Sequence, residues 1–406
     1  MKRLAALAWM LVSIIGCGDD ASPTPDADVG LDATVDANVA PDAETSDATV
    51  DRSLDAVADA TVDAMVDAEP PCEAPRVCDP GPYNYAFVSS EESLLGEVGG
   101  PAGADATCNR LASAAGLPGR YIGWVSSSAV SARDRLGDAS GWIRTDLRPV
   151  ATNREDLFQG RLKYLLDVDE NGNRVAPGPT ATGTAIDGTA TEENCEEWTT
   201  SEPTARLIGG SPIAGGRFWS MGFLNQCSQR GRIYCFGVDQ NRALPDTGVA
   251  GRVAFISNTV VPGDGGLNAA DTACAQDATD AGLLGQFQAL LPADGMSAIS
   301  RFDLAGAPWV RPDGMPIFAS PGDWATEAQP LLPILLAADG TYLRGLVWSG
   351  AESQFATPDN YCENWSTTSA AVQSRMVRSD LAGESWFGSG SGGCDRSANR
   401  VFCLER

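Results

Sequence analysis

The chain has 406 residues, of which 43% are apolar, and a formal net charge of −26 at pH 7. It contains no histidine, which excludes Ser-His-Asp and Cys-His catalysis and every zinc site that needs imidazole. The acidic balance argues against nucleic acid as a partner, because a phosphate-binding face needs clustered basic side chains.

Residues 1–16 are typical of an export signal. Two basic residues precede an apolar run over 4–15, which is shorter than the roughly 20 residues of a membrane-spanning helix. The run ends in Ile-Ile-Gly-Cys at 14–17, which resembles the lipobox of bacterial lipoproteins. That resemblance implies cleavage before Cys17, acylation of this cysteine and anchoring in the lipid membrane. Because Gly18 follows the cysteine, we expect sorting to the outer membrane and a surface-facing protein.

Residues 17–71 comprise the lipidated Cys17 and an acidic tether. From residue 18 on, the tether holds 15 Asp and Glu, one Arg and no aromatic residue. Such a composition cannot bury enough apolar surface to offset chain entropy, so we expect a disordered segment. Cys72 and Cys78 lie in a proline-rich junction, residues 72–82, and are expected to form a local disulfide that ends the tether.

Two modules follow, over residues 83–238 and 252–406, joined by a linker at 239–251. Each is predicted to begin with a short strand, a Gly-rich turn and a helix that carries a cysteine, Cys108 or Cys274. An arginine lies 27 residues beyond that cysteine in both copies. Cys-Glu-x-Trp then occurs at 195–198 and at 362–365, with a second Trp 24 residues after its cysteine in both. These shared offsets indicate an internal repeat.

The cysteines of the two modules match one for one. Their spacings are 87, 32 and 8 residues in the first module and 88, 32 and 9 in the second. Four cysteines permit three pairings per module, of which we favour an outer pair that encloses an inner pair. Metal binding by these cysteines is disfavoured because the spacing contains no CxxC pair. The favoured pairs are Cys108–Cys235, Cys195–Cys227, Cys274–Cys403 and Cys362–Cys394.

With these residues assembled, each module resembles the endostatin-type branch of the C-type-lectin-like fold. The whole chain is similar to bacterial surface lipoproteins of unassigned function that carry such modules. The resemblance implies an α+β fold with two helices and an irregular long loop per module, and disulfides nested in the favoured order. It rests on Gly-Ala-Asp-Ala-Thr-Cys at 103–108, Leu-Phe-Gln-Gly at 157–160, Cys-Glu-x-Trp-x-Thr at 195–200, Tyr-Cys-Glu-Asn-Trp at 361–365 and Val-Phe-Cys-Leu-Glu at 401–405.

The modules depart from the sugar-binding members of that fold at the calcium site. Neither Trp219 nor Trp386 is followed by the Asn-Asp of the calcium-binding Trp-Asn-Asp element, and the zinc-binding histidines of endostatin have no counterpart. Asp359 and Asn360 offer oxygen ligands, but calcium needs six to eight. We therefore predict no metal and no cofactor, with calcium as the disfavoured alternative.

We expect any binding site in the loops that Cys-Glu-x-Trp anchors, around 181–194 and 350–360. Trp198 and Trp365 are expected in the core, whereas the second Trp of each module could equally be a sugar-stacking platform. Glu196 and Glu363 have no second carboxylate at a matching offset, which a glycosidase needs, so no catalytic residue is predicted. The candidate ligand-binding residues are Glu193, Asn194, Trp219, Asp359, Asn360 and Trp386.

The sequence thus predicts a non-catalytic surface lipoprotein of the bacterial cell envelope whose two modules bind a glycan or a surface protein. A structural or spacer role in the envelope is the first alternative. A carboxylate-dependent hydrolase is the second and less favoured one.

Overall fold

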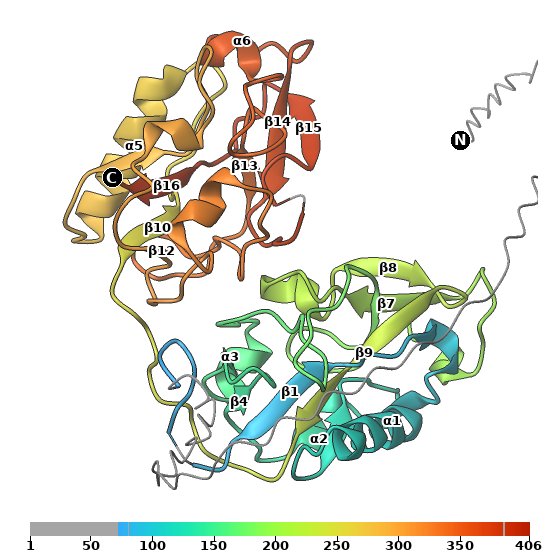
Figure 1. Cartoon of the computed structure of the whole chain (residues 1–406). Coiled ribbons are helices and arrows are strands. Elements are labelled where there is room, and N and C mark those ends of the chain that lie inside the picture. The colour runs from blue at the N-terminus through green and yellow to red at the C-terminus, as the bar shows by residue number, and fades with distance from the viewer. Residues whose placement is uncertain (1–71, 80, 385) are drawn as a thin grey trace, which may run out of the picture. The chain divides into compact units, whose positions relative to one another are not determined.

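The computed structural model describes residues 72–79, 81–384 and 386–406. The predicted signal peptide, Cys17 and the tether lie outside these residues. The described part is an α+β fold with several mixed sheets, which confirms the α+β class predicted from the sequence (Figure 1). No helix in this part of the chain is long and apolar enough to cross a membrane.

The first module is built on a mixed nine-stranded sheet with β9 (Arg230–Gly237) at its centre. β9 pairs antiparallel with β1 (Asn84–Val88), which places Phe87 opposite Cys235. Every residue of β9 from Ile233 onward is buried, so both faces of this strand are covered. The other strands are β2 (Ser93–Leu94), β3 (Tyr121–Gly123), β4 (Trp142–Ile143), β5 (Pro149–Ala151), β6 (Thr180–Ala181), β7 (Arg206–Gly210) and β8 (Phe223–Gln226).

The second module repeats this plan with two smaller sheets. Its strands are β10 (Arg252–Ile256), β11 (Phe287–Ala289), β12 (Trp309–Val310), β13 (Leu346–Trp348), β14 (Gln373–Arg378), β15 (Gly390–Gly393) and β16 (Phe402–Glu405). One sheet has the order β11-β16-β10-β12 and the other β13-β14-β15. Phe255 of β10 lies opposite Cys403 of β16, the same register as Phe87 and Cys235 in the first module. The internal repeat therefore extends to strand pairing.

Each module has one long helix, α1 (Gly100–Ala114) in the first and α5 (Gly266–Asp280) in the second (Figure 1). Gly116, beyond the end of α1, has a φ of 71°, the left-handed conformation that often terminates helices. The buried residues of α1 lie three or four positions apart along one face, namely Gly100, Ala104, Cys108, Leu111 and Ala112.

The further helix expected in each module beyond the long one is short. α3 (Arg154–Phe158) begins after Asn153, whose side chain accepts a hydrogen bond from the backbone N–H of Asp156 at 2.9 Å. The matching element is a 3-10 helix, η4 (Pro321–Ala325), which starts with a capping box at Ser320. The remaining helical turns are η1 (Leu95–Glu97), α2 (Ala132–Leu136), α4 (Cys195–Trp198), η2 (Gly216–Trp219), η3 (Ile299–Arg301) and α6 (Cys362–Trp365).

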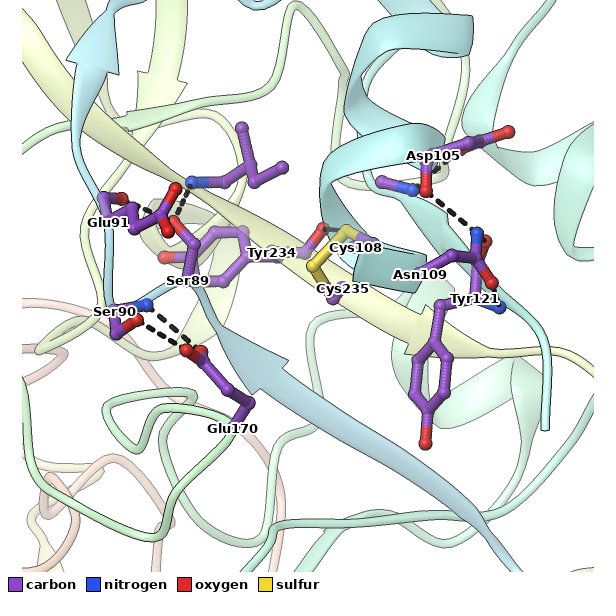
Figure 2. Close-up of a disulfide and its surroundings, with 12 residues drawn as sticks. Ser89, Ser90, Glu91, Asp105, Cys108, Asn109, Tyr121, Glu170, Tyr234 and Cys235 are labelled. Carbon is purple, nitrogen blue, oxygen red and sulfur yellow. Dashed lines mark hydrogen bonds between the residues drawn. A yellow bond between two sulfur atoms is a disulfide. The ribbon is translucent and has the colours of Figure 1, made fainter. Parts of the chain in front are cut away.

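Five disulfides link the described residues. In each module the outer bridge joins the long helix to the last strand, with Cα atoms 5.4 Å apart in both copies. Figure 2 shows the first of these, between Cys108 and Cys235. The pairing is the nested one favoured from the sequence. The bonds are Cys72–Cys78, Cys108–Cys235, Cys195–Cys227, Cys274–Cys403 and Cys362–Cys394.

The repeated arginine also has the same role in both modules. Arg135 pairs with Asp105 of α1, and Arg301 pairs with Asp271 of α5 at 2.6 Å. Each arginine also donates a hydrogen bond to a backbone carbonyl at the end of the following strand, Gly123 in the case of Arg135. The ion pair therefore ties the long helix to the sheet in each module.

Candidate functional site

The Cys-Glu-x-Trp motif folds as one left-handed turn in both modules. The φ angles are 57°, 52°, 59° and 64° over 195–198, and 55°, 51°, 59° and 57° over 362–365. The left-handed conformation costs an L-residue roughly 1–2 kcal/mol. Four such residues in succession persist only where the surrounding structure holds them.

Two contacts that both modules share hold the turn in place. The inner disulfide fixes its first residue. Its tryptophan donates the indole N–H to a backbone carbonyl, from Trp198 to Ser126 at 2.8 Å and from Trp365 to Pro292 at 3.0 Å. Both rings are almost completely buried, at 6% and 3% exposed, which agrees with the predicted core position. The motif is therefore a structural anchor for the loops around it.

The third residue of the turn takes part in hydrogen bonds with a carboxylate in both modules, but different residues carry that carboxylate. In the first, Glu197 accepts hydrogen bonds from the side chain of Asn194 (2.8 Å) and the backbone N–H of Ser128 (3.0 Å), which lower the pKa of its carboxyl. In the second, Asn364 donates to Asp294 on the facing loop at 3.0 Å, and Tyr361 donates to the same carboxylate. The carboxylate thus belongs to the turn in the first module and to the facing loop in the second.

The structure separates the predicted ligand-binding residues of the first module. Glu193 is exposed. Asn194 is 3% exposed and caps the left-handed turn by accepting from the backbone N–H of Glu197. Trp219 is fully buried, and its ring centroid lies 5.0 Å from that of Trp124. The side chain of Trp219 thus belongs to the core, where a ligand from solvent does not reach it.

The predicted residues of the second module lie closer to the surface. Asp359 and Asn360 are exposed, and the Asp359 carboxylate pairs with Arg375 at 3.0 Å. Trp386 is 5% exposed and lines a cavity. Among the described residues, no group of three or more Cys, Asp or Glu side chains is placed to hold a metal ion.

The cavity that Trp386 lines has a volume of about 510 Å³ and is formed within the second module. Three segments line it: residues 326–329 after η4, residues 352–356 of the long loop, and the segment that contributes Glu384 and Trp386. The predicted loop 350–360 therefore does border a hollow. Sequence reasoning missed the other side chains in its lining, because they lie on separate segments and form no motif. They include Glu327, Gln329, Glu352, Phe355 and Glu384.

Buried contacts shape the base of this cavity. Gln354 is 2% exposed, and its amide donates to the carbonyls of Trp324 (3.0 Å) and Thr326 (3.3 Å). This ties the long loop to the end of η4. The ring of Trp386 packs against Trp324 at 5.7 Å between centroids and against Phe318 at 5.6 Å. The base of the cavity is therefore set by side chains with little freedom to move.

The rim of the cavity is acidic. Glu327, Glu352 and Glu384 are all exposed, and none of them forms an ion pair with another described residue. Gln329 lies 3.4 Å from the Glu384 carboxylate. No arginine or lysine is among the lining residues. The cavity thus offers carboxylates, an amide and two aromatic side chains, Phe355 and Trp386, to whatever enters it.

Neither the known family models nor the curated proteins include a match to this chain. A functional assignment therefore rests on the geometry of the sites.

Proposed function

We propose that the protein is a non-catalytic binding protein of the bacterial cell surface, anchored to the membrane through an acylated Cys17, and that its second module binds a glycan. The observation that carries the proposal is the cavity of about 510 Å³ beside the long loop of that module. This volume is within the range of small-ligand sites, and the lining combines two aromatic side chains with polar groups that could orient a ligand.

The disulfides support the location. Five disulfides within the described residues are typical of an extracytoplasmic protein, because thiols stay reduced in the cytosol. Each module is then framed by its own two disulfides, and loops on rigid scaffolds are where recognition usually takes place.

The test is a glycan array and a set of bacterial surface extracts, probed with the full mature chain carrying Cys17→Ser so that it remains in solution. We expect a glycan to bind, and Glu352→Gln or Glu384→Gln to weaken binding at least several-fold. Glu363→Gln is the matched control, because Glu363 is an exposed carboxylate of the same module that does not line the cavity. Absence of any binder in both screens would contradict a binding role and favour the spacer alternative.

The carboxylates around the cavity also give the hydrolase alternative a specific place. A glycosidase needs two carboxylates at a defined separation, one of them protonated. Incubation of every bound glycan with the protein, followed by mass spectrometry, distinguishes the two functions. Intact glycan after prolonged incubation is the expected result, and shortened products that disappear with Glu352→Gln would contradict the non-catalytic assignment.

A further inference from the structure

We infer that β8, the edge strand of the first module, is a docking site for an extended acidic segment of a partner protein, which adds to the sheet as a further strand. The inference concerns the first module and is independent of the glycan cavity proposed for the second. Three features carry it: an open strand edge, apolar side chains exposed on that edge, and an arginine near each of its ends.

The edge of β8 is open to strand addition. β8 is the last strand of its sheet and, within the described part of the chain, pairs with β7 alone (Figure 1). An edge strand presents backbone N–H and C=O groups to which an extended peptide can bind. A charged side chain, a proline or a bulge commonly blocks such edges. β8 has the sequence Phe-Leu-Asn-Gln and a regular register with β7, so it carries none of the three.

The same edge exposes apolar surface. Phe223 is 40% exposed and Leu224 is 59% exposed. As neighbours along a strand, they point to opposite faces of the sheet. A strand added beside β8 would place its own side chains next to both of them, and such cross-strand apolar pairs are stabilising.

An arginine lies near each end of β8. Arg206 of β7 is in register with Gln226, the last residue of β8. At the other end, the guanidinium of Arg217 lies 4.8 Å from the ring centroid of Phe218, which in turn lies 5.8 Å from that of Phe223. Neither arginine forms an ion pair with another described residue. Both are therefore available to carboxylates of a docked segment.

These charges favour an acidic partner over a second copy of the chain. Antiparallel pairing of two β8 strands would bring Arg217 of one copy toward Arg206 of the other, and parallel pairing would bring identical arginines together. Like charges repel in both arrangements. An extended segment with a carboxylate near each end meets the opposite charge at both ends instead.

The surface is specific to the first module. The inner cysteines are 32 residues apart in both modules, so the residues between them match without a gap. The second module has a polar side chain, an acidic side chain or glycine at the positions of the two arginines and the two exposed apolar residues. The matched pairs are Arg206 and Gln373, Arg217 and Glu384, Phe223 and Gly390, and Leu224 and Ser391.

The experiment applies the full mature chain with Cys17→Ser to an array of capped hexapeptides. The four central residues are varied over Val, Ile, Thr and Phe, and both end residues are Asp, Asn or Lys. At about 0.15 M salt, charges beyond about 8 Å are largely screened, so the acidic remainder of the chain interferes little. We expect Asp-ended peptides to bind, the Asn-ended forms to bind about fivefold more weakly, and the Lys-ended forms not to bind.

Variants that introduce the residues of the second module test the location. Arg206→Gln and Leu224→Ser should each weaken binding of the Asp-ended peptides at least threefold. Arg396→Gln is the matched control, because Arg396 is an exposed arginine beside Gly392 of β15, the edge strand of the second module. It changes the net charge as Arg206→Gln does and should leave binding unchanged. Methylation of the peptide backbone nitrogens should abolish binding, because strand addition needs these donors.

The other outcomes overturn the inference. If no Asp-ended peptide binds, β8 is not a docking edge, and if Lys-ended peptides bind equally well, the partner is not acidic. Binding that neither Arg206→Gln nor Leu224→Ser weakens would place the peptide elsewhere. Light scattering that shows dimers which Leu224→Ser dissociates would identify a second copy as the occupant. Each of these results leaves glycan binding by the second module untouched.

Discussion

The tryptophan of each left-handed turn requires a glycine opposite it. Gly183 and Gly350 have φ angles of 53° and 67°, and a Cβ atom added there would lie 2.9 Å and 2.7 Å from the rings of Trp198 and Trp365. A residue other than glycine would thus meet both a disfavoured backbone conformation and a side-chain overlap. The same requirement in both modules shows how closely the packing around the turn has been retained.

Replacement of either glycine by alanine should therefore destabilise its module. We expect Gly350→Ala to lower the free energy of unfolding by about 2–5 kcal/mol, the sum of the left-handed penalty and overpacking. Gly340→Ala is the control, because Gly340 also has a positive φ, 82°, but an added Cβ meets nothing within 4 Å. It should cost only about 1–2 kcal/mol. Chemical denaturation of both variants measures the difference, and equal losses would show that the tryptophan ring adjusts freely.

At the scale of elements, the two disulfides of each module have different tasks. The outer bridge joins the long helix to the last strand across 129 residues in the second module. The inner bridge spans 32 residues and holds the first residue of the left-handed turn. The outer bridge restricts the unfolded chain more, whereas the inner bridge is in contact with the strained element.

Removal of each bridge separates these tasks. The loop-entropy relation gives the Cys274–Cys403 bridge about 5 kcal/mol and the Cys362–Cys394 bridge about 4 kcal/mol as upper values. We expect the outer double Cys→Ala variant to be the less stable one in thermal denaturation followed by tryptophan fluorescence. The reverse order would indicate that holding the left-handed turn matters more than restricting the unfolded chain. The matching pair of variants in the first module provides an internal repeat of the measurement.

At the scale of the whole molecule, the modules share a framework and differ at the surface. Strand register, nested disulfides, the helix-to-sheet ion pair and the left-handed turn occur in both. The carboxylates that rim the cavity occur in the second alone. A duplicated scaffold with one altered surface fits a protein in which the modules have separate roles.

The proposed anchor belongs to this scale, since it determines where both modules act. We expect the natural chain to partition with membranes, because several acyl chains on Cys17 would give stable attachment. Cys17→Ser removes the residue that would carry these chains, so we expect the variant in the soluble fraction. Fractionation followed by intact-mass measurement tests this. Recovery of the Cys17→Ser variant with the membranes would contradict lipid anchoring at this residue.

Much of the framework could be predicted from the sequence because it depends on spacing. Equal cysteine and tryptophan offsets predicted the repeat, and the apolar residues of 104–112 predicted α1. The candidate site was predicted only in part. The loop 350–360 and Trp386 border the cavity, but Trp219, at the same offset in the first module, is fully buried. Identical spacing cannot distinguish a tryptophan at a cavity from one inside the core.

The sequence by itself determined the modular repeat and the matching spacing of its cysteines, and it carries the export signal that we propose. These features depend only on the order of residues along the chain and on their composition. Only the tertiary structure decided the left-handed turn and the cavity. Glu327, Glu352 and Glu384 become neighbours through the packing of three separate segments, and no local pattern in the sequence marks such an encounter. The binding surface is therefore a property of the fold, held in place by the turn that the repeated motif forms.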